Sequence, residues 1–321
     1  MMYDMRKSVP NVRLFISLAA VLVLAACGQK KAVEDKAFYD VSIAVDETFR
    51  PIMEEEMKVF NAKHPEAIMK PVYAPETDAL NMLLTDSVRM VLATRPLSQK
   101  EKDAIRATYQ LQVRQQPVAY DAVALIINRA NRDSLISIMD LERIVTGQIT
   151  RWEQLQDATS RGEIEVVFDN SNSSCVRYVR DSVCGGAELH GNIKEAVTNQ
   201  KVIEYVAQTP GALGIIGVDW LRNADDSTNL TFNKNIRVMS VGYSSVTTED
   251  NCFQPVQYYI ATGQYPFTRC LYLITTDPRP KAFGVYFYFF MRDQDAQLVI
   301  TKSSQLLPYM PVQVKTVEMT E

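Results

Sequence analysis

Glycine, tryptophan and histidine are scarce in this chain, and their scarcity argues against several kinds of function. The 321 residues include 12 glycines, two tryptophans and two histidines, His64 and His190. The sequence has no His/Cys/Glu spacing typical of a metal site, no G-x-S-x-G elbow, no P-loop and no GxGxxG fingerprint. Cys175, at a predicted helix start, is a candidate nucleophile, but no histidine is placed to activate it. We therefore predict that the protein is not an enzyme and uses no cofactor and no metal.

A long apolar run is also missing beyond the first 26 residues, which predicts that the rest of the chain is globular. Hydrophobic residues make up 47% and charged residues 22% of the sequence, as in domains with a real core. The net charge of −4 becomes about −6 without residues 1–26, which hold three basic residues and one acidic residue. This acidic balance argues against nucleic acid as the partner.

The first 28 residues carry the pattern of an export signal. Three basic residues precede an apolar run over 14–26, which is too short to span a bilayer, since a span needs ~20 residues. The sequence LAAC at 24–27 resembles a bacterial lipobox, in which Cys27 is lipidated and becomes the new N-terminus. We predict a signal peptide at 1–26, a tether at 27–40 and a protein anchored in the cell envelope facing the periplasm. An ordinary signal peptide that happens to contain a cysteine is the alternative.

Four cysteines follow Cys27, and an even number in an exported chain permits disulfides. Cys175 and Cys184 are expected to begin and end one helix, which would separate them by about 13.5 Å at ~1.5 Å per residue. A disulfide tolerates no more than ~7 Å between Cα atoms. Cys252 with Cys270 is therefore the expected bridge, and free buried thiols are the equally weighted alternative.

Apolar runs and amphipathic segments alternate along the chain, which predicts an α/β fold with parallel strands. A strand at 41–45 leads into a helix from Pro51 that ends at His64-Pro65, and further strands are expected at 67–73 and 88–93. A second unit starts at Pro117 with a nearly continuous apolar strand, as expected where both faces of a sheet are covered. The further elements expected are helices at 79–84, 141–146, from 175, 194–207, 283–291 and 295–303, and strands at 166–168, 213–218, 236–241, 256–260, 271–274 and 312–317.

Five segments in order resemble a known family. LERIVTGQITRWEQL at 141–155 is similar to the family segment IFSGKITNWXXL, and 120–131 resembles the strand before it. TPGALGIIG at 209–217 is similar to TPGAIGYVG, QYPFTRCLY at 264–272 to YPLSRPLY, and RPL at 95–97 to the SRPL loop. The family is the phosphate-binding protein of bacterial ABC-type phosphate importers, of the type II periplasmic binding protein fold.

The resemblance implies a two-lobed fold with a ligand cleft between the lobes. Lobe 1 would hold 41–116 and 261–321, and lobe 2 would hold 117–260, with hinges near 116–120 and 252–260. The implied ligand is inorganic phosphate or another small oxyanion, and the implied partners are permease subunits of an ABC transporter.

The candidate ligand contacts lie in loops where strands end and helices begin, the places where unpaired N–H groups and open sheet edges favour anion binding. They are Glu47, Thr48, Thr94, Arg95, Asp121, Asn172, Ser173, Ser174 and Arg177.

Several of these candidates have a plain structural alternative. One residue of 172–174 is expected to be a helix N-cap. Arg177 is either a ligand contact or a solvated charge, and Arg95 either a contact or the ion-pair partner of Asp46 or Glu47. Asp121 interrupts an apolar strand, so it is expected to pair with an arginine or with a ligand hydroxyl.

Two departures from the family pattern lead to a second hypothesis. The first loop has Asp46 and Glu47 where the family has glycine and small hydroxyl residues, and 169–174 lacks the glycines of SDGSGT. The acidic first loop would repel a dianion unless it is neutralised. The alternative is a repurposed fold that acts as an envelope sensor or accessory lipoprotein.

Overall fold

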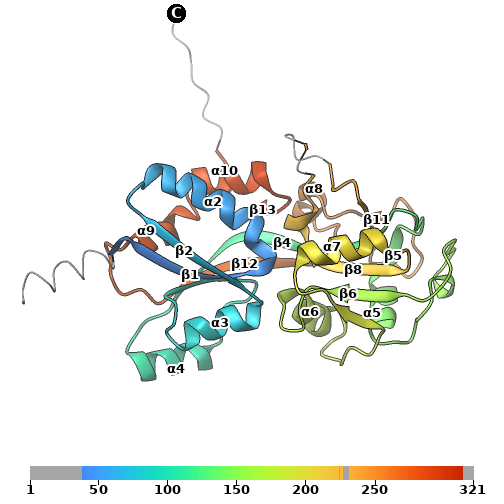
Figure 1. The fold of residues 1–321 in the computed structure, drawn as a ribbon, viewed down its shortest axis with the longest axis horizontal. Coiled ribbons are helices and arrows are strands. Elements are labelled where there is room, and N and C mark those ends of the chain that lie inside the picture. Colours follow the sequence, from blue (N-terminus) through green and yellow to red (C-terminus); the bar gives the residue numbers. More distant parts are fainter. Residues whose placement is uncertain (1–37, 224, 227–230, 314–321) are drawn as a thin grey trace, which may run out of the picture.

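Two α/β lobes share one continuous sheet, so the predicted two-lobed α/β architecture is confirmed (Figure 1). A computed structural model describes residues 38–223, 225–226 and 231–313. The strand order of the sheet is β2-β1-β3-β12-β4-β8-β6-β7. The predicted signal peptide and Cys27 lie outside the described residues. No helix in the described part of the chain is long and apolar enough to cross a membrane.

Lobe 1 is built on three parallel strands, β1 (Asp40–Asp46), β2 (Ile68–Ala74) and β3 (Met90–Ala93). Because successive side chains alternate between faces, Ile43 packs in one core and Ala44 in the other. The helices of lobe 1 cover both faces (Figure 1). They are α2 (Arg50–Lys63), α9 (Phe283–Phe290) and α10 (Gln294–Ser303) on the first face, and α3 (Glu76–Leu84) and α4 (Gln99–Tyr109) on the second.

Lobe 2 continues the sheet and adds a small second one. Its strands in the large sheet are β4 (Arg114–Asn128), β6 (Glu165–Phe168), β7 (Ile193–Glu195), β8 (Ala212–Gly217) and β9 (Ile236–Val238). The small sheet consists of β5 (Leu135–Ser137), β10 (Ser240–Gly242) and β11 (Cys252–Phe253). The helices are α5 (Ile138–Val145), α6 (Ser174–Tyr178), α7 (Asn199–Gln208) and α8 (Gln257–Ala261).

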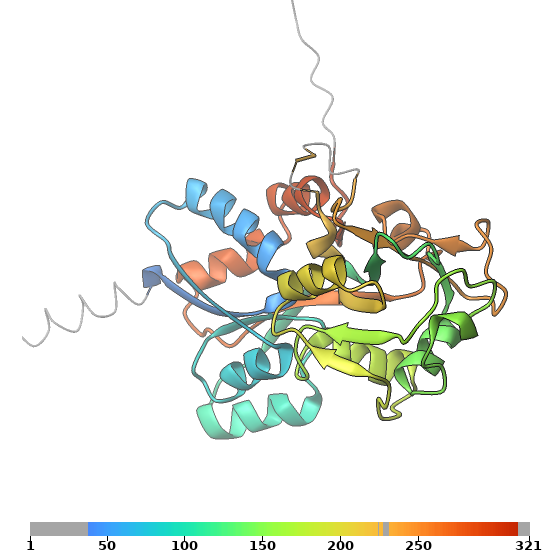
Figure 2. The same cartoon turned by 45° about the vertical axis from the view of Figure 1, so that its right-hand side comes forward.

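Strands β4 and β12 (Thr268–Thr275) connect the lobes, as Figures 1 and 2 both show. The first part of β4 pairs with β12 and its later part pairs with β8. The first predicted hinge, 116–120, lies within β4. The second, 252–260, forms β11 and α8 instead, and the chain returns to lobe 1 through β12. The predicted lobe boundaries themselves remain a prediction.

Several predicted elements differ from the structure. The strand expected at 236–241 is divided into β9 and β10, which belong to different sheets. The helix expected at 194–207 is divided into β7 and α7, because Val197 has a φ of +77° and Thr198 caps a new helix by accepting a hydrogen bond from Lys201 N. The strand expected at 256–260 is helix α8. The last expected strand, 312–317, falls mostly outside the described residues, and β13 (Leu307–Pro308) pairs with β4 earlier in the chain.

The predicted disulfide is wrong in this structure. All four described cysteines are free. The reason is that Cys252 lies on β11 of the small sheet, whereas Cys270 lies on β12 opposite Tyr120 in the large sheet. Cys184, expected at the end of one regular helix, instead follows a π-helical turn after α6.

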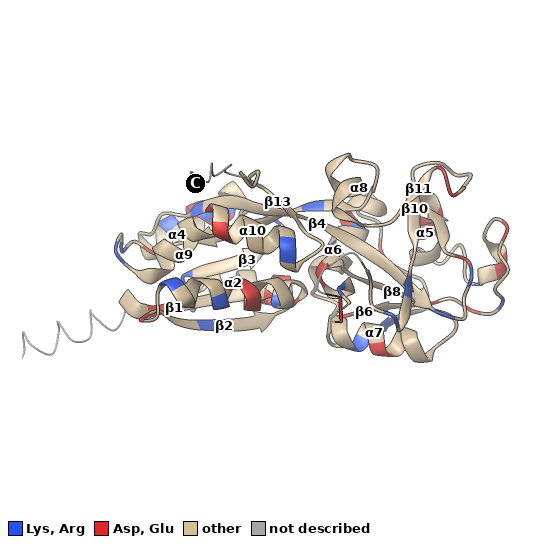
Figure 3. Cartoon of the chain, turned by 90° about the horizontal axis from the view of Figure 1, so that it is seen from above, with Lys and Arg blue, Asp and Glu red and all other residues tan. Residues whose placement is uncertain are grey.

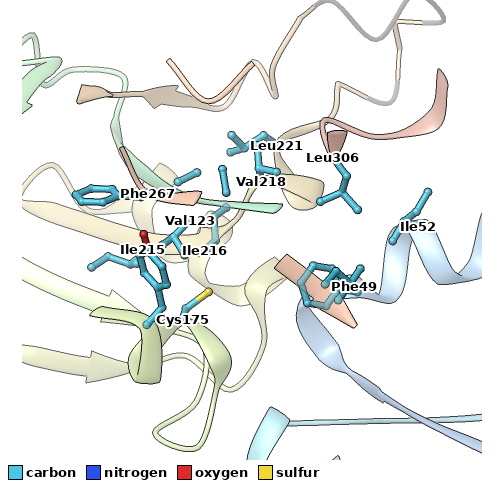
Figure 4. Packing of buried hydrophobic residues seen from close by; sticks show 14 of the residues in the cluster. Phe49, Ile52, Val123, Cys175, Ile215, Ile216, Val218, Leu221, Phe267 and Leu306 are labelled. Carbon is cyan, nitrogen blue, oxygen red and sulfur yellow. The ribbon is translucent and has the colours of Figure 1, made fainter. Parts of the chain in front are cut away.

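Apolar side chains pack across the junction between the lobes. Phe49 and Ile52 lie on the lobe 1 side, and Val218 and Leu221 lie on the lobe 2 side (Figure 4). All four are at most 2% exposed and belong to one cluster. Each such side chain contributes roughly 1.5–3 kcal/mol when fully buried. The lobes are therefore closed on one another.

Candidate ligand site between the lobes

The candidate residues gather where the lobes meet. Lobe 1 contributes the loop after β1 and the loop after β3, and lobe 2 contributes the loop after β6 and the start of α6. Open α/β sheets present their ligand-binding loops at the carboxyl ends of the strands, which is why the loops after β1, β3 and β6 were expected to lie together.

The start of α6 touches lobe 1 through hydroxyl groups. Ser173 is the N-cap, since its Oγ accepts a hydrogen bond from Val176 N at 3.3 Å. Ser174 Oγ lies 3.4 Å from Thr48 Oγ1, across the junction. Asn172 has an exposed side chain, and its carbonyl accepts a hydrogen bond from Thr77 N at 3.3 Å. The loop thus meets lobe 1 through one hydroxyl and one carbonyl.

Arg177 points into the junction rather than into solvent. Its Nε donates to Glu76 Oε2 at 2.6 Å, and its Nη2 donates to Thr94 Oγ1 at 2.7 Å and to Glu76 Oε1 at 3.3 Å. Thr94 donates to Glu76 Oε1 through both its N–H and its hydroxyl, each at 2.7 Å. A carboxylate of lobe 1 therefore receives four hydrogen bonds, two of them from lobe 2.

Glu76 was missed by the sequence reasoning, although a signal for it exists. It is the first residue of α3, directly after β2 and Pro75. Because β1, β2 and β3 are parallel, the end of β2 opens on the same sheet edge as the loops that were selected after β1 and β3. The same strand-end rule would have included it.

Asp121 pairs with an arginine, as one of its two predicted alternatives stated. Arg269 Nε donates to Asp121 Oδ2 at 2.6 Å, and the two side chains are 4% and 0% exposed. Arg269 Nη2 lies 3.7 Å from Cys175 Sγ, beneath the start of α6. Arg269 Nη1 is buried without a hydrogen-bond partner among the described residues. Arg269 lies in one of the segments that carry the resemblance but was not selected as a site residue.

Glu47 also contacts lobe 2. Its Oε2 accepts hydrogen bonds from Asn199 Nδ2 at 2.8 Å and Asn199 N at 3.3 Å, at the start of α7. Asn199 Nδ2 is also 3.2 Å from Asp169 Oδ2, and Asn199 Oδ1 accepts from Gly217 N at 3.3 Å. A Cβ atom at Gly217 would overlap the Thr48 side chain, which shows how closely the two lobes approach.

Arg95 takes no direct part in this network. Its guanidinium donates to both oxygens of Glu101 at 2.8 and 3.0 Å, and hydrogen bonding from Arg95 lowers the pKa of Glu101 to about 2. The predicted alternative of a pair with Asp46 or Glu47 is wrong, because Glu101 is the partner of Arg95, and the ligand contact stays a prediction. Arg95 instead lines an open cavity of about 700 Å³ at the rim of the junction, between α4 and α6.

Carboxylates dominate the buried polar groups of the junction. They are Asp46, Glu47, Glu76, Asp121, Asp169 and Asp219, each at most 8% exposed. Burial raises the pKa of Asp46 to about 7 and that of Asp219 to about 8. Burial is the largest effect on the Glu76 carboxyl and opposes its ionisation, but the hydrogen bonds from Arg177 and Thr94 and the charges of Arg177 and Arg269 together outweigh it and lower its pKa. Figure 3 shows that charges of both signs are otherwise spread over both lobes.

Comparison with known proteins identifies the family. Residues 28–294 match the periplasmic binding protein (PBP) superfamily domain. The chain belongs to the PBP superfamily. Among curated proteins it is similar to the phosphate-binding protein PstS of Borreliella burgdorferi, with 20% identity over 273 residues that cover 83% of this chain and 89% of that protein. The resemblance noted in the sequence is thereby confirmed.

Solved structures of PBP proteins share the fold. One, described as a phosphate ABC transporter substrate-binding protein with bound phosphate, is from Clostridium perfringens. It has a TM-score of 0.69 and 19% identity, covering 84% of this chain and 100% of that one. An ABC-type phosphate transport receptor from Vibrio cholerae has a TM-score of 0.60 and 18% identity, with coverage of 84% and 100%. At these identities the likeness concerns the fold.

This PBP member has no cluster of three or more His, Cys, Asp or Glu that could hold a metal ion within the residues that the structure describes.

The buried pair Arg269–Asp121 yields a stability prediction. Asp121→Asn should lower the free energy of unfolding by about 3–5 kcal/mol, because it leaves the guanidinium buried without a carboxylate. Urea unfolding followed by circular dichroism measures this. Asp181→Asn is the control, since it breaks a pair with Arg180 whose side chains are 47% and 44% exposed, and such a pair contributes little. Equal losses from the two substitutions would contradict the assignment.

The raised pKa of Asp219 yields a prediction about pH. The pKa of Asp219 is about 8 in the folded state, against its ordinary value of 3.8, so the folded state keeps this proton to a higher pH than the unfolded chain does. The resulting stability is fully present below pH 4 and is lost as the pH rises through 8. Asp219→Asn, which cannot ionise, should therefore reduce the loss of unfolding free energy between pH 5 and pH 9. Asp181→Asn is again the control. If the free energy of unfolding depends on pH in the same way in the wild type and in Asp219→Asn, Asp219 does not titrate as predicted.

Proposed function

We propose that the protein is a solute-binding protein of the cell envelope that captures phosphate or a related oxyanion between its lobes for an ABC importer. The observation that carries the proposal is the network of Thr94 and Arg177. A backbone N–H, a hydroxyl and a guanidinium from two lobes converge on one carboxylate, Glu76. These are the donor types that hold oxyanions in proteins.

Other features support the same proposal. The phosphate-binding relatives share the two-lobed fold over most of their length. The hydroxyl groups of Thr48 and Ser174 face one another across the junction, 3.4 Å apart. Lobe opening and closure around a solute is the movement typical of such proteins, with no bond made or broken.

A second candidate function rests on the charge of the junction. Arg177 is bonded to Glu76, Arg269 to Asp121 and Arg95 to Glu101, so these three cations are already neutralised by carboxylates of the chain. The junction also buries the acidic side chains of Asp46, Glu47, Asp169 and Asp219. This favours the alternative in which the fold serves as an envelope sensor or accessory lipoprotein.

The proposed location follows from the sequence at Cys27. We infer that residues 1–26 are removed and that Cys27 carries a lipid anchor, with residues 27–40 as the tether. The match to the PBP domain begins at residue 28, which supports this division. The lipid would hold the protein on the periplasmic side of the membrane, where it can contact the permease subunits of an importer.

The lipid anchor is testable in a bacterial host. The wild-type chain should fractionate with membranes and incorporate labelled palmitate, and Cys27→Ser should abolish the label and release the protein. Cys175→Ser serves as the matched control and should keep both label and membrane association. A wild-type protein that stays unlabelled and soluble would show an ordinary signal peptide instead.

Calorimetric titration tests the ligand. Residues 28–321 are titrated with phosphate, arsenate and sulfate, beside Arg177→Ala and Arg180→Ala. Phosphate should bind the wild type and Arg180→Ala, and Arg177→Ala should weaken binding roughly 10- to 100-fold, since a hydrogen bond to a charged group contributes about 1.5–3 kcal/mol. Absence of heat with every oxyanion would reject oxyanion capture and favour the accessory function.

A further inference from the structure

We propose that Glu76 is a built-in competitor of the solute: its carboxylate occupies the anion receptor formed by Thr94 and Arg177, and a bound oxyanion has to displace it. The inference rests on the proposed function, because it concerns the same receptor. It goes further by naming the residue that determines how strongly the receptor binds an external anion.

The hydrogen bonds of Glu76 reproduce those that a small oxyanion would receive. Oε1 accepts from Thr94 N and Thr94 Oγ1, both at 2.7 Å, and Oε2 accepts from Arg177 Nε at 2.6 Å. The side chain of Glu76 is 2% exposed, against 25% for Arg177. The receptor is therefore occupied by a carboxylate of its own chain, which accepts the hydrogen bonds that Thr94 and Arg177 would otherwise donate to an external anion.

The same carboxylate links the two lobes. Glu76 and Thr94 belong to lobe 1, whereas Arg177 lies on α6 of lobe 2. In the neighbouring contact, Thr77 N donates to the carbonyl of Asn172 in lobe 2 at 3.3 Å. Opening the lobes would separate Glu76 from Arg177 but leave its bonds to Thr94 intact. Glu76 thus stabilises the closed arrangement of the lobes in the absence of a solute. In an ordinary solute-binding protein, the bound ligand stabilises that arrangement.

An intramolecular competitor reduces the apparent affinity for the solute. A tethered group acts at an effective concentration of millimolar or more. An external anion therefore occupies the receptor only if it binds there more favourably than the tethered carboxylate does. Its negative charge also repels the incoming anion in a poorly hydrated site. We therefore expect weak phosphate binding by the wild type and binding at least tenfold tighter once the carboxylate is removed.

A purely structural ion pair predicts the opposite result. If Glu76 merely oriented Arg177 for the solute, its removal would weaken phosphate binding or leave it unchanged. The two roles are therefore separated by the direction of the change in affinity, and not by its size.

The experiment compares Glu76→Gln and Glu76→Ala with the wild type and with Asp78→Asn. Glutamine preserves the side-chain volume, so it provides a folded variant if alanine disturbs the junction. Asp78 lies on the same helix, is only partly buried and forms no ion pair with any residue that the structure describes, so it controls for the loss of one negative charge. Phosphate affinity is measured by calorimetry, and lobe closure by the radius of gyration from X-ray scattering of the whole processed chain, released from its anchor by Cys27→Ala.

We expect the ligand-free wild type and Asp78→Asn to be compact, the ligand-free Glu76→Ala chain to be larger, and phosphate to restore its compact size. We also expect phosphate to bind at least tenfold tighter to the Glu76 variants than to the control. Scattering curves that superimpose in the absence of phosphate, or variants that bind phosphate no tighter than the wild type does, would overturn the competitor role. If no chain binds any oxyanion but Glu76→Ala still expands, the proposed ligand fails while the internal closure by Glu76 stands.

Discussion

The burial of charge where two strands cross between the lobes is the constraint on which the rest of the site depends. Arg269 on β12 and Asp121 on β4 are almost fully buried at the crossing and neutralise one another. A guanidinium in such a place requires a carboxylate beside it, since desolvating an unpaired charge is prohibitive. Once this pair is fixed, the start of α6 lies against Arg269 through Cys175, and Ser174 meets Thr48 of the opposite lobe.

Closure of the lobes depends on carboxylates that cross the junction from both sides. Glu47 and Glu76 of lobe 1 accept hydrogen bonds from Asn199 and Arg177 of lobe 2. In the reverse direction, Asp219 of lobe 2 accepts from Ile52 N at 2.8 Å, at the first turn of α2. The N–H groups of a first helical turn lack partners within their own helix, and Asp219 supplies an acceptor for one of them. Because burial raises the pKa of Asp219 to about 8, this acceptor is a protonated carboxyl at neutral pH, whereas the Glu76 carboxyl keeps its charge beside Arg177.

The sequence allowed the fold to be predicted and selected loops that the structure brings together between the lobes, but it did not reveal the ion pairs among their residues. Strand ends such as Asp46–Thr48 are visible in the order of apolar and polar residues, because that order is local. The partner of Arg177 is Glu76, 101 residues away, and the partner of Arg269 is Asp121, 148 residues away. Nothing local separates these pairs from the alternatives. The helix expected at 194–207 failed for a local reason, the left-handed conformation of Val197.

The departures from the family pattern are explained by the same network. The loop at 169–174 lacks glycine, so its contribution to the junction is made by the hydroxyls of Ser173 and Ser174 and by one carbonyl. In the acidic first loop, Glu47 accepts hydrogen bonds from Asn199, whereas burial raises the pKa of Asp46 to about 7. A ligand shifts a two-state equilibrium only by the difference between its affinities for the two states. Because closure here already has internal hydrogen bonds, a solute changes the lobe arrangement only by binding better than Glu76 does.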